Sequence, residues 1–484
     1  MSICKFTYPQ IMRSTAKPYA IAAGHEKTAQ AAAEILQQGG NAFDAILAAM
    51  MMSFVAEPLL SSPGGGGFLL VSGPNQAPKL LDFFSDTPSI QASQIDPEQV
   101  DFYPIMGDFG TRQQEFHIGH AAAAVPGVPA GIFKAHQTLC SLPLTAIAKP
   151  AIEAANKGLQ VNHQQAYVGM ILKPILASTT EAKTLFNNYQ SGQVWQNQQL
   201  ARFLDTLSTA DHNWFYQGEI AKKLAEQGDS LLCPEDFTDY QCAVREPLTL
   251  KLDTHQVLTN PPPSTGGYLI VEQLKRLKNR HDVAAVLEAM QHADDLKRTP
   301  MTEVTRGTTH MSVADSAGNL ASLTLSNGEG NGQIVPDCGF MLNNFLGEED
   351  INAGGFFRWT QRERMKSMMS PTLILGDQHQ YALGTGGSNR IKTTLFQVIN
   401  HLLNHNKTLK HAIEAPRMHY ENGHLDIEPG FSKDELATLK KTNPIHTEWH
   451  NHNLYFGGVN AVQTGQTTTA VGDFRRHGCG IVGV

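Results

Sequence analysis

The dipeptide Gly307-Thr308, in the middle of the chain, has the residue types that an internal self-cleavage site requires. Gly307 has no side chain to hinder attack on its own carbonyl carbon, and the hydroxyl of Thr308 follows one peptide bond later. Cleavage between them would leave Thr308 with a free α-amine, whose ordinary pKa of about 8 suits a general base near neutral pH. A hydroxyl that has its own amine as base is a complete nucleophilic device. These two residues therefore predict a cleavage site and a catalytic threonine.

A predicted β-hairpin would place a second hydroxyl beside Thr308. Polar and apolar residues alternate within 310–326 around a short loop centred on Ala317, which is typical of two antiparallel strands. With this centre, Ser326 lies opposite Thr308 and shares its face of the sheet. A β-bulge would shift the register and bring a neighbour such as Asn327 there instead. An ordinary hairpin rich in serine and threonine is the alternative interpretation.

Two adjacent glycines, Gly386 and Gly387, could stabilise an anion. They follow a predicted strand at 381–383 and precede a predicted helix at 390–404, so backbone N–H groups at the helix N-terminus would point at negative charge. In acyl transfer such a site is an oxyanion hole, where losing one donor costs about 3 kcal/mol of transition-state stabilisation. A phosphate cradle and a plain strand-to-helix turn are the alternatives. Neither common nucleotide-binding glycine motif occurs at this position.

The composition is that of a well-packed globular protein. The 484 residues carry a net charge of −8 with no acidic or basic run, so neither nucleic acid nor an anionic membrane is expected as a partner. The histidines form no recognisable metal-binding motif, and we expect no metal and no cofactor. Six scattered cysteines without CxxC spacing favour free thiols in a reducing compartment.

The elements that would position the reactive residues lie on both sides of Gly307. Hydrophobic periodicity predicts a helix over 27–38 and another over 42–55, with Asn41 and Asp44 as a capping pair for the second. Residues 279–307 are charged and contain a proline, and we expect an exposed segment where the chain is cut. The other predicted elements are a strand at 68–72 and helices at 129–137, 145–158 and 268–278.

No targeting or membrane-spanning segment is recognisable in the sequence. The N-terminus contains Lys5 and Arg13 but no apolar run of signal-peptide length. The longest apolar stretch, 45–55, is too short to span a bilayer and is typical of a buried helix. We therefore expect a cytoplasmic protein.

Several motifs occur in a fixed order along nearly the whole chain. They are Gly39-Gly40-Asn41-Ala42-Phe43-Asp44-Ala45, Glu57-Pro58 through Gly67-Phe68, Ala124-Val125-Pro126-Gly127, Pro261-Pro262-Pro263-Ser264-Thr265-Gly266-Gly267, Gly307-Thr308-Thr309-His310, Leu342-Asn343-Asn344, Ser367-Met368-Met369-Ser370-Pro371-Thr372, Gly384-Thr385-Gly386-Gly387-Ser388 and Glu414-Ala415-Pro416-Arg417. In this order they resemble the γ-glutamyltranspeptidases (glutathione hydrolases) and their acylase relatives among the N-terminal nucleophile hydrolases. The resemblance implies an α+β fold of four layers, αββα. It also implies one precursor that cuts itself into two interlocked segments of a single domain, 1–307 and 308–484.

The resemblance assigns catalytic roles residue by residue. Thr308 would be the nucleophile for self-cleavage and for catalysis. Ser326 would be a supporting hydroxyl, in agreement with the hairpin register. Gly386 and Gly387 would form the oxyanion hole.

The substrate-binding positions match less completely. Asn327 and Glu348 lie near the positions that bind the α-carboxylate and α-amine of a glutamyl group, and Ser367 matches one of two adjacent serines that hold the carboxylate. The second serine is Met368 here. Phe84 stands where glutathione-cleaving members carry an arginine for the α-carboxylate. An aromatic ring cannot replace a bidentate arginine–carboxylate pair.

Three functions are compatible with the sequence. The first is a γ-glutamyl hydrolase or transferase acting on small molecules like glutathione, with another cation in place of the arginine. The second is an amide hydrolase for a different acyl group, such as the dicarboxylic acid monoamides that cephalosporin acylases accept. The third is an unprocessed, inactive homologue, against which the intact nucleophile argues. Phe84 favours the second function, whereas the resemblance implies the first.

Overall fold

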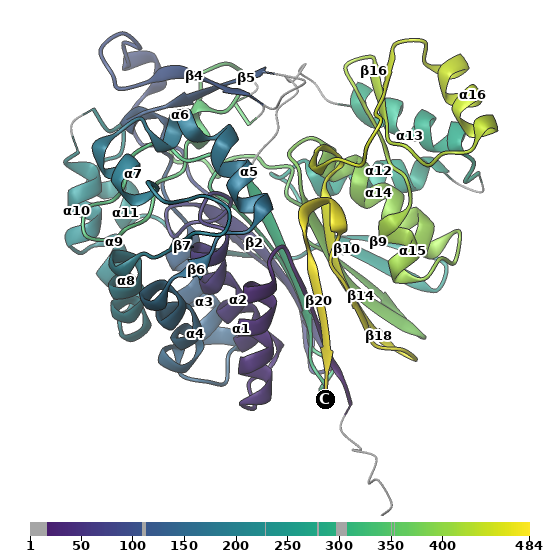
Figure 1. Ribbon diagram of the computed structural model, residues 1–484, viewed down its shortest axis with the longest axis horizontal. Helices are drawn as coiled ribbons and strands as arrows, with labels where there is room; N and C mark the ends of the chain where they lie inside the picture. The colour runs from purple at the N-terminus through teal and green to yellow at the C-terminus, as the bar shows by residue number, and fades with distance from the viewer. Residues whose placement is uncertain are drawn as a thin grey trace, which may run out of the picture.

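Two β-sheets lie face to face between two layers of helices (Figure 1). The computed structural model describes residues 17–108, 113–227, 229–277, 280–296, 307–349, 351–352 and 354–484. Alternate residues of the strands enter different cores: Ile21 and Ala23 pack against the helices of the first layer, while Ala20 and Ala22 face the other sheet. This alternation follows from the two-residue period of a strand. The expected four-layer α+β fold is confirmed.

The first sheet has seven strands and carries the predicted hairpin. All its neighbouring strands are antiparallel, and Thr308 pairs with Ser326 without a bulge. The hairpin register predicted from its loop is therefore confirmed. In spatial order the strands are β20 (Cys479–Gly483), β1 (Tyr19–Ala23), β11 (Thr308–Ala314), β12 (Leu320–Ser326), β2 (Gly66–Gly73), β3 (Gln76–Phe83) and β8 (Ala243–Arg245).

The second sheet has six strands, and one of these strands ends at the predicted glycine pair. In spatial order its strands are β19 (Thr469–Val471), β18 (Gly458–Gly465), β14 (His379–Gly386), β13 (Thr372–Gly376), β10 (His255–Thr259) and β9 (Leu248–Leu252). Both sheets contain strands from before and after Gly307. The two parts of the chain therefore interlock throughout the core.

The first helical layer covers the outer face of the seven-stranded sheet (Figure 1). Its central helix, α2 (Ala42–Ala56), is buried along its whole length and begins with a capping box between Asn41 and Asp44, as predicted. The other helices on this side are α1 (Glu26–Gln37), α3 (Val128–Leu139), α4 (Leu144–Lys157), α5 (His163–Ile171), α6 (Lys173–Leu176), α7 (Thr180–Leu185), α8 (Gln198–Thr209), α9 (His212–Tyr216), α10 (Glu219–Ala225) and α11 (Pro234–Thr238).

The second helical layer covers the six-stranded sheet (Figure 1). It consists of α12 (Gly266–Leu277), α13 (Val283–Asp295), α14 (Arg390–Leu403), α15 (Leu409–Glu414) and α16 (Lys433–Thr442). Small sheets and single turns complete the described part of the chain. They are β4 (Tyr103–Asp108) with β5 (Gln113–Ile118), β6 (Leu159–Gln160) with β7 (Val194–Trp195), β15 (Met418–Glu421) with β16 (His424–Ile427) and β17 (His446–Glu448), and the 3-10 turns η1 (Ala92–Gln94), η2 (His120–Ala122), η3 (Phe345–Gly347), η4 (Leu454–Phe456) and η5 (Phe474–Arg476).

The expectation of an exposed segment over 279–307 is wrong where the structure describes it. Helix α13 occupies 283–295 and buries one face, because Ala285, Val286, Ala289 and Met290 recur at helical spacing. Gly307 is also buried. Residues 297–306 and the N-terminal features at Lys5 and Arg13 lie outside the described residues. Within the described ranges, no helix is long and apolar enough to cross a membrane.

Candidate active site

Thr308, Ser326 and the carbonyl group of Gly307 form a short chain of hydrogen bonds. Thr308 is the first residue of β11, and its hydroxyl lies 3.5 Å from the hydroxyl oxygen of Ser326 on β12. The Ser326 hydroxyl in turn donates to the carbonyl oxygen of Gly307 at 2.8 Å. The backbone N–H of Gly328 donates to the same serine oxygen at 3.1 Å and fixes its position. The bond predicted to be cut is therefore polarised by the residue opposite the predicted nucleophile.

The glycine run before β2 explains how the neighbouring strand approaches this site. A Cβ atom on Gly65 would lie 2.2 Å from the carbonyl oxygen of Ser326, which no other residue could tolerate without moving the chain. The glycines let β2 pack directly against β12. This packing accounts for Gly65 and Gly67, whereas a Cβ atom on Gly64 would meet Leu342 and one on Gly66 would meet Phe84.

The structure brings Gly386 and Gly387 to Thr308 from the other sheet. A Cβ atom on Gly386 would lie 2.2 Å from the carbonyl oxygen of Thr308. Gly387 has a φ of +131°, a conformation that favours glycine. The pair leads from β14 into α14, which begins at Arg390. The predicted strand–glycine–helix arrangement is therefore present.

A small cavity of about 20 Å³ lies beside the two hydroxyl groups. Four more residues that the sequence analysis singled out line this cavity: Phe84, Glu348, Ser367 and Met368. All four are buried. The complete lining is Phe84, Thr308, Ser326, Phe345, Glu348, Ile351, Ser367, Met368, Met369, Ser388 and Ile391.

Ser367 is held in this lining by the proline-rich loop before α12. Its carbonyl oxygen accepts a hydrogen bond from the backbone N–H of Thr265 at 3.0 Å, and its hydroxyl accepts one from the N–H of Met369 at 3.1 Å. The motif at 261–267 therefore supports the site without entering it.

Asn327 lies outside the lining of the small cavity. Its side-chain amide donates to the carbonyl oxygens of Met341 and Leu342, both at 3.3 Å. These contacts hold Asn327 just beyond the end of β12, which ends at Ser326. Its role at the substrate stays a prediction.

A second cavity, of about 80 Å³, opens on the other side of Thr308. Its wall includes Glu57, Thr309 and Arg476, three polar residues that sequence reasoning did not assign to the site. Leu59, Val168, Ile171, Leu172, Tyr189 and Leu454 contribute apolar surface.

Glu57 is one of two buried acids in the wall of this second cavity; the other is Glu329. Glu57 ends helix α2, where its carboxylate accepts hydrogen bonds from the hydroxyls of Thr309 at 2.8 Å and Thr28 at 3.2 Å. Burial raises the pKa of Glu57 to about 7, against the opposing effect of these two hydrogen bonds. The sequence signal was an acid placed directly after a mostly apolar helix.

Arg476 contacts Thr308 through the main chain. Its guanidinium donates to the carbonyl oxygen of Thr308 at 3.4 Å and, more closely, to that of Leu454 at 3.1 and 3.2 Å. Burial, with the nearby charge of Arg390, lowers the pKa of Arg476 to about 10, so the side chain stays charged near neutral pH.

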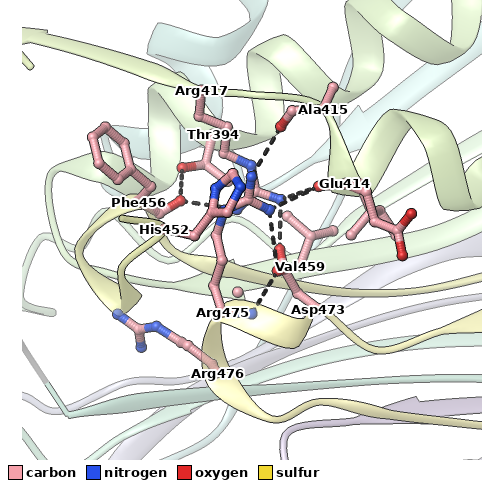
Figure 2. Close-up of polar contacts among 12 residues, drawn as sticks. Thr394, Glu414, Ala415, Arg417, His452, Phe456, Val459, Asp473, Arg475 and Arg476 are labelled. Carbon is pink, nitrogen blue, oxygen red and sulfur yellow. Dashed lines mark hydrogen bonds and ion pairs between the residues drawn. The ribbon is translucent and has the colours of Figure 1, made fainter. Parts of the chain in front are cut away.

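A buried ion-pair cluster holds the turn that carries Arg476. Arg475 pairs with Glu428 at 2.6 Å and with Asp473 at 3.2 Å, and Arg417 pairs with Asp473 at 2.5 Å. Figure 2 shows Arg475 pointing into the cluster and Arg476 pointing away from it. Nothing in the sequence distinguishes these neighbours, because both are arginines in one short turn.

His310 follows Thr308 by two residues, contributes to the wall of the second cavity and links neighbouring strands. Its two ring nitrogens contact the hydroxyls of Thr324 at 2.8 Å and Ser312 at 2.9 Å. Burial lowers the pKa of His310 to about 3, so the ring is neutral. It connects β11 with β12 directly beneath the site.

Comparisons with known proteins identify the family and agree with the fold. The sequence matches the family model for gamma-glutamyltranspeptidase over residues 28–299 and 284–483. The glutathione hydrolase proenzyme of Pseudomonas aeruginosa is 27% identical over 470 residues, covering 83% of each chain. The acylase ACY 1 proenzyme of Pseudomonas sp. (strain V22) is 25% identical, covering 87% of this chain and 85% of the relative.

A solved structure extends the agreement to the whole fold. Cephalosporin acylase from Bacillus halodurans superposes with a TM-score of 0.80 over 99% of both chains, at 20% identity. At that identity the likeness concerns the fold alone. With the family model matched along nearly the whole sequence, this chain belongs to the γ-glutamyltranspeptidase family.

Proposed function

We propose that this protein is a self-cleaving amidohydrolase and acyltransferase that uses Thr308 to cleave γ-glutamyl or related amide bonds. One contact carries the proposal. The Ser326 hydroxyl donates to the carbonyl oxygen of Gly307 at 2.8 Å while the Thr308 hydroxyl lies 3.5 Å from the same serine. These two contacts support a reaction in which Thr308 attacks the carbonyl group of Gly307 while Ser326 donates a hydrogen bond to its oxygen.

Self-cleavage would begin with attack of the Thr308 hydroxyl oxygen on the carbonyl carbon of Gly307. The peptide C–N bond breaks, so that Gly307 becomes an ester on the threonine oxygen and Thr308 gains a free α-amine. Water then hydrolyses the ester and leaves a carboxylate on Gly307. The hydrogen bond from Ser326 would stabilise the negative charge that develops on the carbonyl oxygen.

Substrate cleavage would reuse the same oxygen. The free amine of Thr308 accepts the hydroxyl proton, the oxygen attacks the substrate's amide carbon, and the leaving amine departs with the proton. The acyl group stays on Thr308 as an ester until water or a second amine releases it. Backbone N–H groups at Gly386 and Gly387 would serve as the oxyanion hole, and the small cavity would receive the acyl group.

The interlocked sheets support cleavage into two segments that remain together. Each sheet takes strands from both 17–296 and 307–484, so cutting at Gly307 breaks one covalent bond but removes no strand from either sheet. The relatives from both Pseudomonas species are themselves described as proenzymes.

The decisive test is the mass of the purified protein. We expect two polypeptides that correspond to residues 1–307 and 308–484, and a single full-length polypeptide from the Thr308→Ala variant. Thr308→Ser, which retains a hydroxyl, is the matched control and should still cleave. A wild-type chain that stays intact after prolonged incubation contradicts the assignment of Thr308.

A further inference from the structure

Self-cleavage needs a base that Thr308 itself cannot supply in the uncleaved chain. Before the peptide bond breaks, the nitrogen of Thr308 belongs to an amide, which donates a hydrogen bond and accepts no proton. The free α-amine that serves as base in substrate cleavage exists only afterwards. Another group must therefore take the hydroxyl proton while the threonine oxygen attacks the carbonyl carbon of Gly307.

His310 is poorly suited to this task, although it lies on the same strand as the proposed nucleophile. Its two ring nitrogens contact the hydroxyls of Thr324 at 2.8 Å and Ser312 at 2.9 Å. Burial lowers the pKa of His310 to about 3, so the ring binds a proton only weakly. The Ser326 hydroxyl is also engaged, because it donates to the carbonyl oxygen of the bond proposed to be cut.

Glu57 shares a cavity with the reacting groups. Gly307, Thr308 and Glu57 all line the second cavity. The Glu57 carboxylate accepts a hydrogen bond from Thr309 at 2.8 Å. Successive side chains of a strand point to opposite faces, so the Thr308 hydroxyl lies on the other side of β11, near Ser326. The cavity at the start of this strand joins the two sides.

This cavity is large enough for water to carry a proton between Thr308 and Glu57. One water molecule needs about 10–15 Å³ of cavity volume and two to four polar partners, and the cavity measures about 80 Å³. Its polar wall includes Asn162 beside the two reacting residues. A hydroxyl hydrogen rotates to suit its partners, so Thr308 can donate to this water in place of Ser326.

The Glu57 carboxylate is held in a fixed position. Its oxygens accept hydrogen bonds from Thr309 on β11 at 2.8 Å and from Thr28 on α1 at 3.2 Å. The turn before α1 covers the first of these contacts, since a Cβ atom on Gly24 would lie 2.5 Å from the carboxylate and 2.8 Å from the Thr309 hydroxyl. A carboxylate has about four acceptor sites, so Glu57 can also bind water.

Burial and its polar neighbours act on the proton of Glu57 in opposite directions. Burial raises the pKa of Glu57 to about 7, while the hydrogen bonds from Thr309 and Thr28 and the charge of Arg476 lower it. A group that titrates near neutral pH can accept a proton and give it back, as a general base in this reaction must.

Other titratable groups face the same cavity from separate elements. Burial lowers the pKa of His25, before α1, to about 4 and that of His310 to about 3, so both rings are neutral near pH 7. Burial raises the pKa of Tyr189, whose phenol keeps its proton. The remaining titratable side chains of the described wall are those of Glu329, Arg476 and His477.

We propose that Glu57 accepts the hydroxyl proton of Thr308 during self-cleavage, through water in the second cavity. This role rests on the self-cleavage proposed above. As the threonine oxygen bonds to the carbonyl carbon of Gly307, its proton passes to the water, and a proton of that water passes to the carboxylate. When the C–N bond breaks, the same route returns a proton to the leaving nitrogen, which becomes the free α-amine. Glu57 is then a carboxylate again.

The rate of self-cleavage as a function of pH tests this role. Newly made chain from cell-free translation is transferred to buffers between pH 5 and pH 9, and the cleaved fraction is followed by gel electrophoresis. For wild type we expect the rate to rise about tenfold per pH unit up to about pH 7 and then to level off, because only the carboxylate accepts a proton. Glu57→Gln should cleave about 100-fold more slowly at pH 8, without this rise.

Thr28→Val supplies a second readout. Valine has nearly the shape of threonine, and residue 28 does not line the cavity. Losing the hydrogen bond to the carboxylate raises the pKa of Glu57, so the midpoint of the rate profile should move up by about one pH unit. Glu329→Gln, the matched change at the other acid of the wall, should keep the wild-type midpoint.

The outcomes separate this role from the proposed function. A rise with pH that persists in folded Glu57→Gln protein overturns the role, and so does a rise that is lost in Glu329→Gln. If thermal unfolding shows that Glu57→Gln does not fold, Thr28→Val decides: a shifted midpoint supports the role and an unshifted one overturns it. Wild-type cleavage that is independent of pH overturns only the role of Glu57, whereas a wild-type chain that cleaves at no pH overturns the proposed function as well.

Discussion

Ser326 lies directly across from Thr308 in the antiparallel pair β11–β12, with their hydroxyl oxygens 3.5 Å apart. The pairing makes one serine a neighbour of both the proposed nucleophile and the bond proposed to be cut, because its hydroxyl also reaches the carbonyl oxygen of Gly307. A single sheet register thus supplies the geometry for self-cleavage.

Replacing Ser326 by alanine should slow self-cleavage by about 100- to 1,000-fold, the effect of losing one donor to a developing oxyanion. The fraction of cleaved chain over time, followed by gel or intact mass, measures this. Ser326→Thr keeps the hydroxyl and should cleave within about tenfold of the wild-type rate. Equal rates for Ser326→Ala and wild type would show that the contact to Gly307 has no role in the reaction.

The same substitution should lower stability by different amounts at the two adjacent arginines of η5. In a Thr308→Ala background, which keeps one covalent chain, Arg475→Met should cost about 3–5 kcal/mol of stability because Glu428 and Asp473 lose a buried partner. Arg476→Met should cost only about 1 kcal/mol, since it loses hydrogen bonds to backbone carbonyls. Denaturant unfolding compares the two variants.

For activity the order should be reversed, with the larger loss at Arg476. With Thr308 present, Arg476→Met should lower kcat by about tenfold, because the carbonyl group of Thr308 loses its contact with the guanidinium. Correctly folded Arg475→Met protein should retain more activity. If both variants lose stability and activity in parallel, Arg476 is only another structural arginine.

Local patterns in the sequence were sufficient to predict the hairpin register and the start of one helix. The loop around Ala317 fixes which residues pair, so the sequence alone predicts that Ser326 lies opposite Thr308. The capping pair Asn41 and Asp44 fixed the start of α2 in the same way. In both, the interacting residues are close in sequence.

The residues of the candidate site that the sequence analysis did not find reach it only through long-range packing. Glu57 reaches Thr309 across 252 positions of sequence, and Arg476 reaches Thr308 across 168. Both contacts require the complete sheets, which no local pattern describes.

The buried acid Glu57 should make stability depend on pH. The folded chain holds the Glu57 proton up to about pH 7, whereas an unfolded glutamate releases it near pH 4.5. Because the folded state binds the extra proton in this window, the free energy of unfolding should fall as the pH rises from about 4.5 to 7. At 1.36 kcal/mol per pH unit, the full effect is about 3 kcal/mol.

The matched experiment compares Thr308→Ala with Thr308→Ala/Glu57→Gln at pH 5 and pH 8. Glutamine cannot titrate, so the double variant should lose less thermal stability between the two pH values than the single variant. Other titrating groups contribute equally to both proteins and cancel in the comparison. Identical losses would mean that Glu57 titrates near its ordinary pKa in the folded chain.

Gly386 should tolerate no side chain, because a Cβ atom there would lie 2.2 Å from the carbonyl oxygen of Thr308 and 2.9 Å from the guanidinium of Arg476. Gly386→Ala must push the start of β11 away from β14, which separates Thr308 from Ser326 and from the glycine pair. We expect self-cleavage to slow at least tenfold. Gly354→Ala is the control, since its Cβ would meet nothing closer than 3.8 Å, and it should cleave at the wild-type rate. Wild-type cleavage by a folded Gly386→Ala variant would show that the approach of β14 to Thr308 is not needed for the reaction.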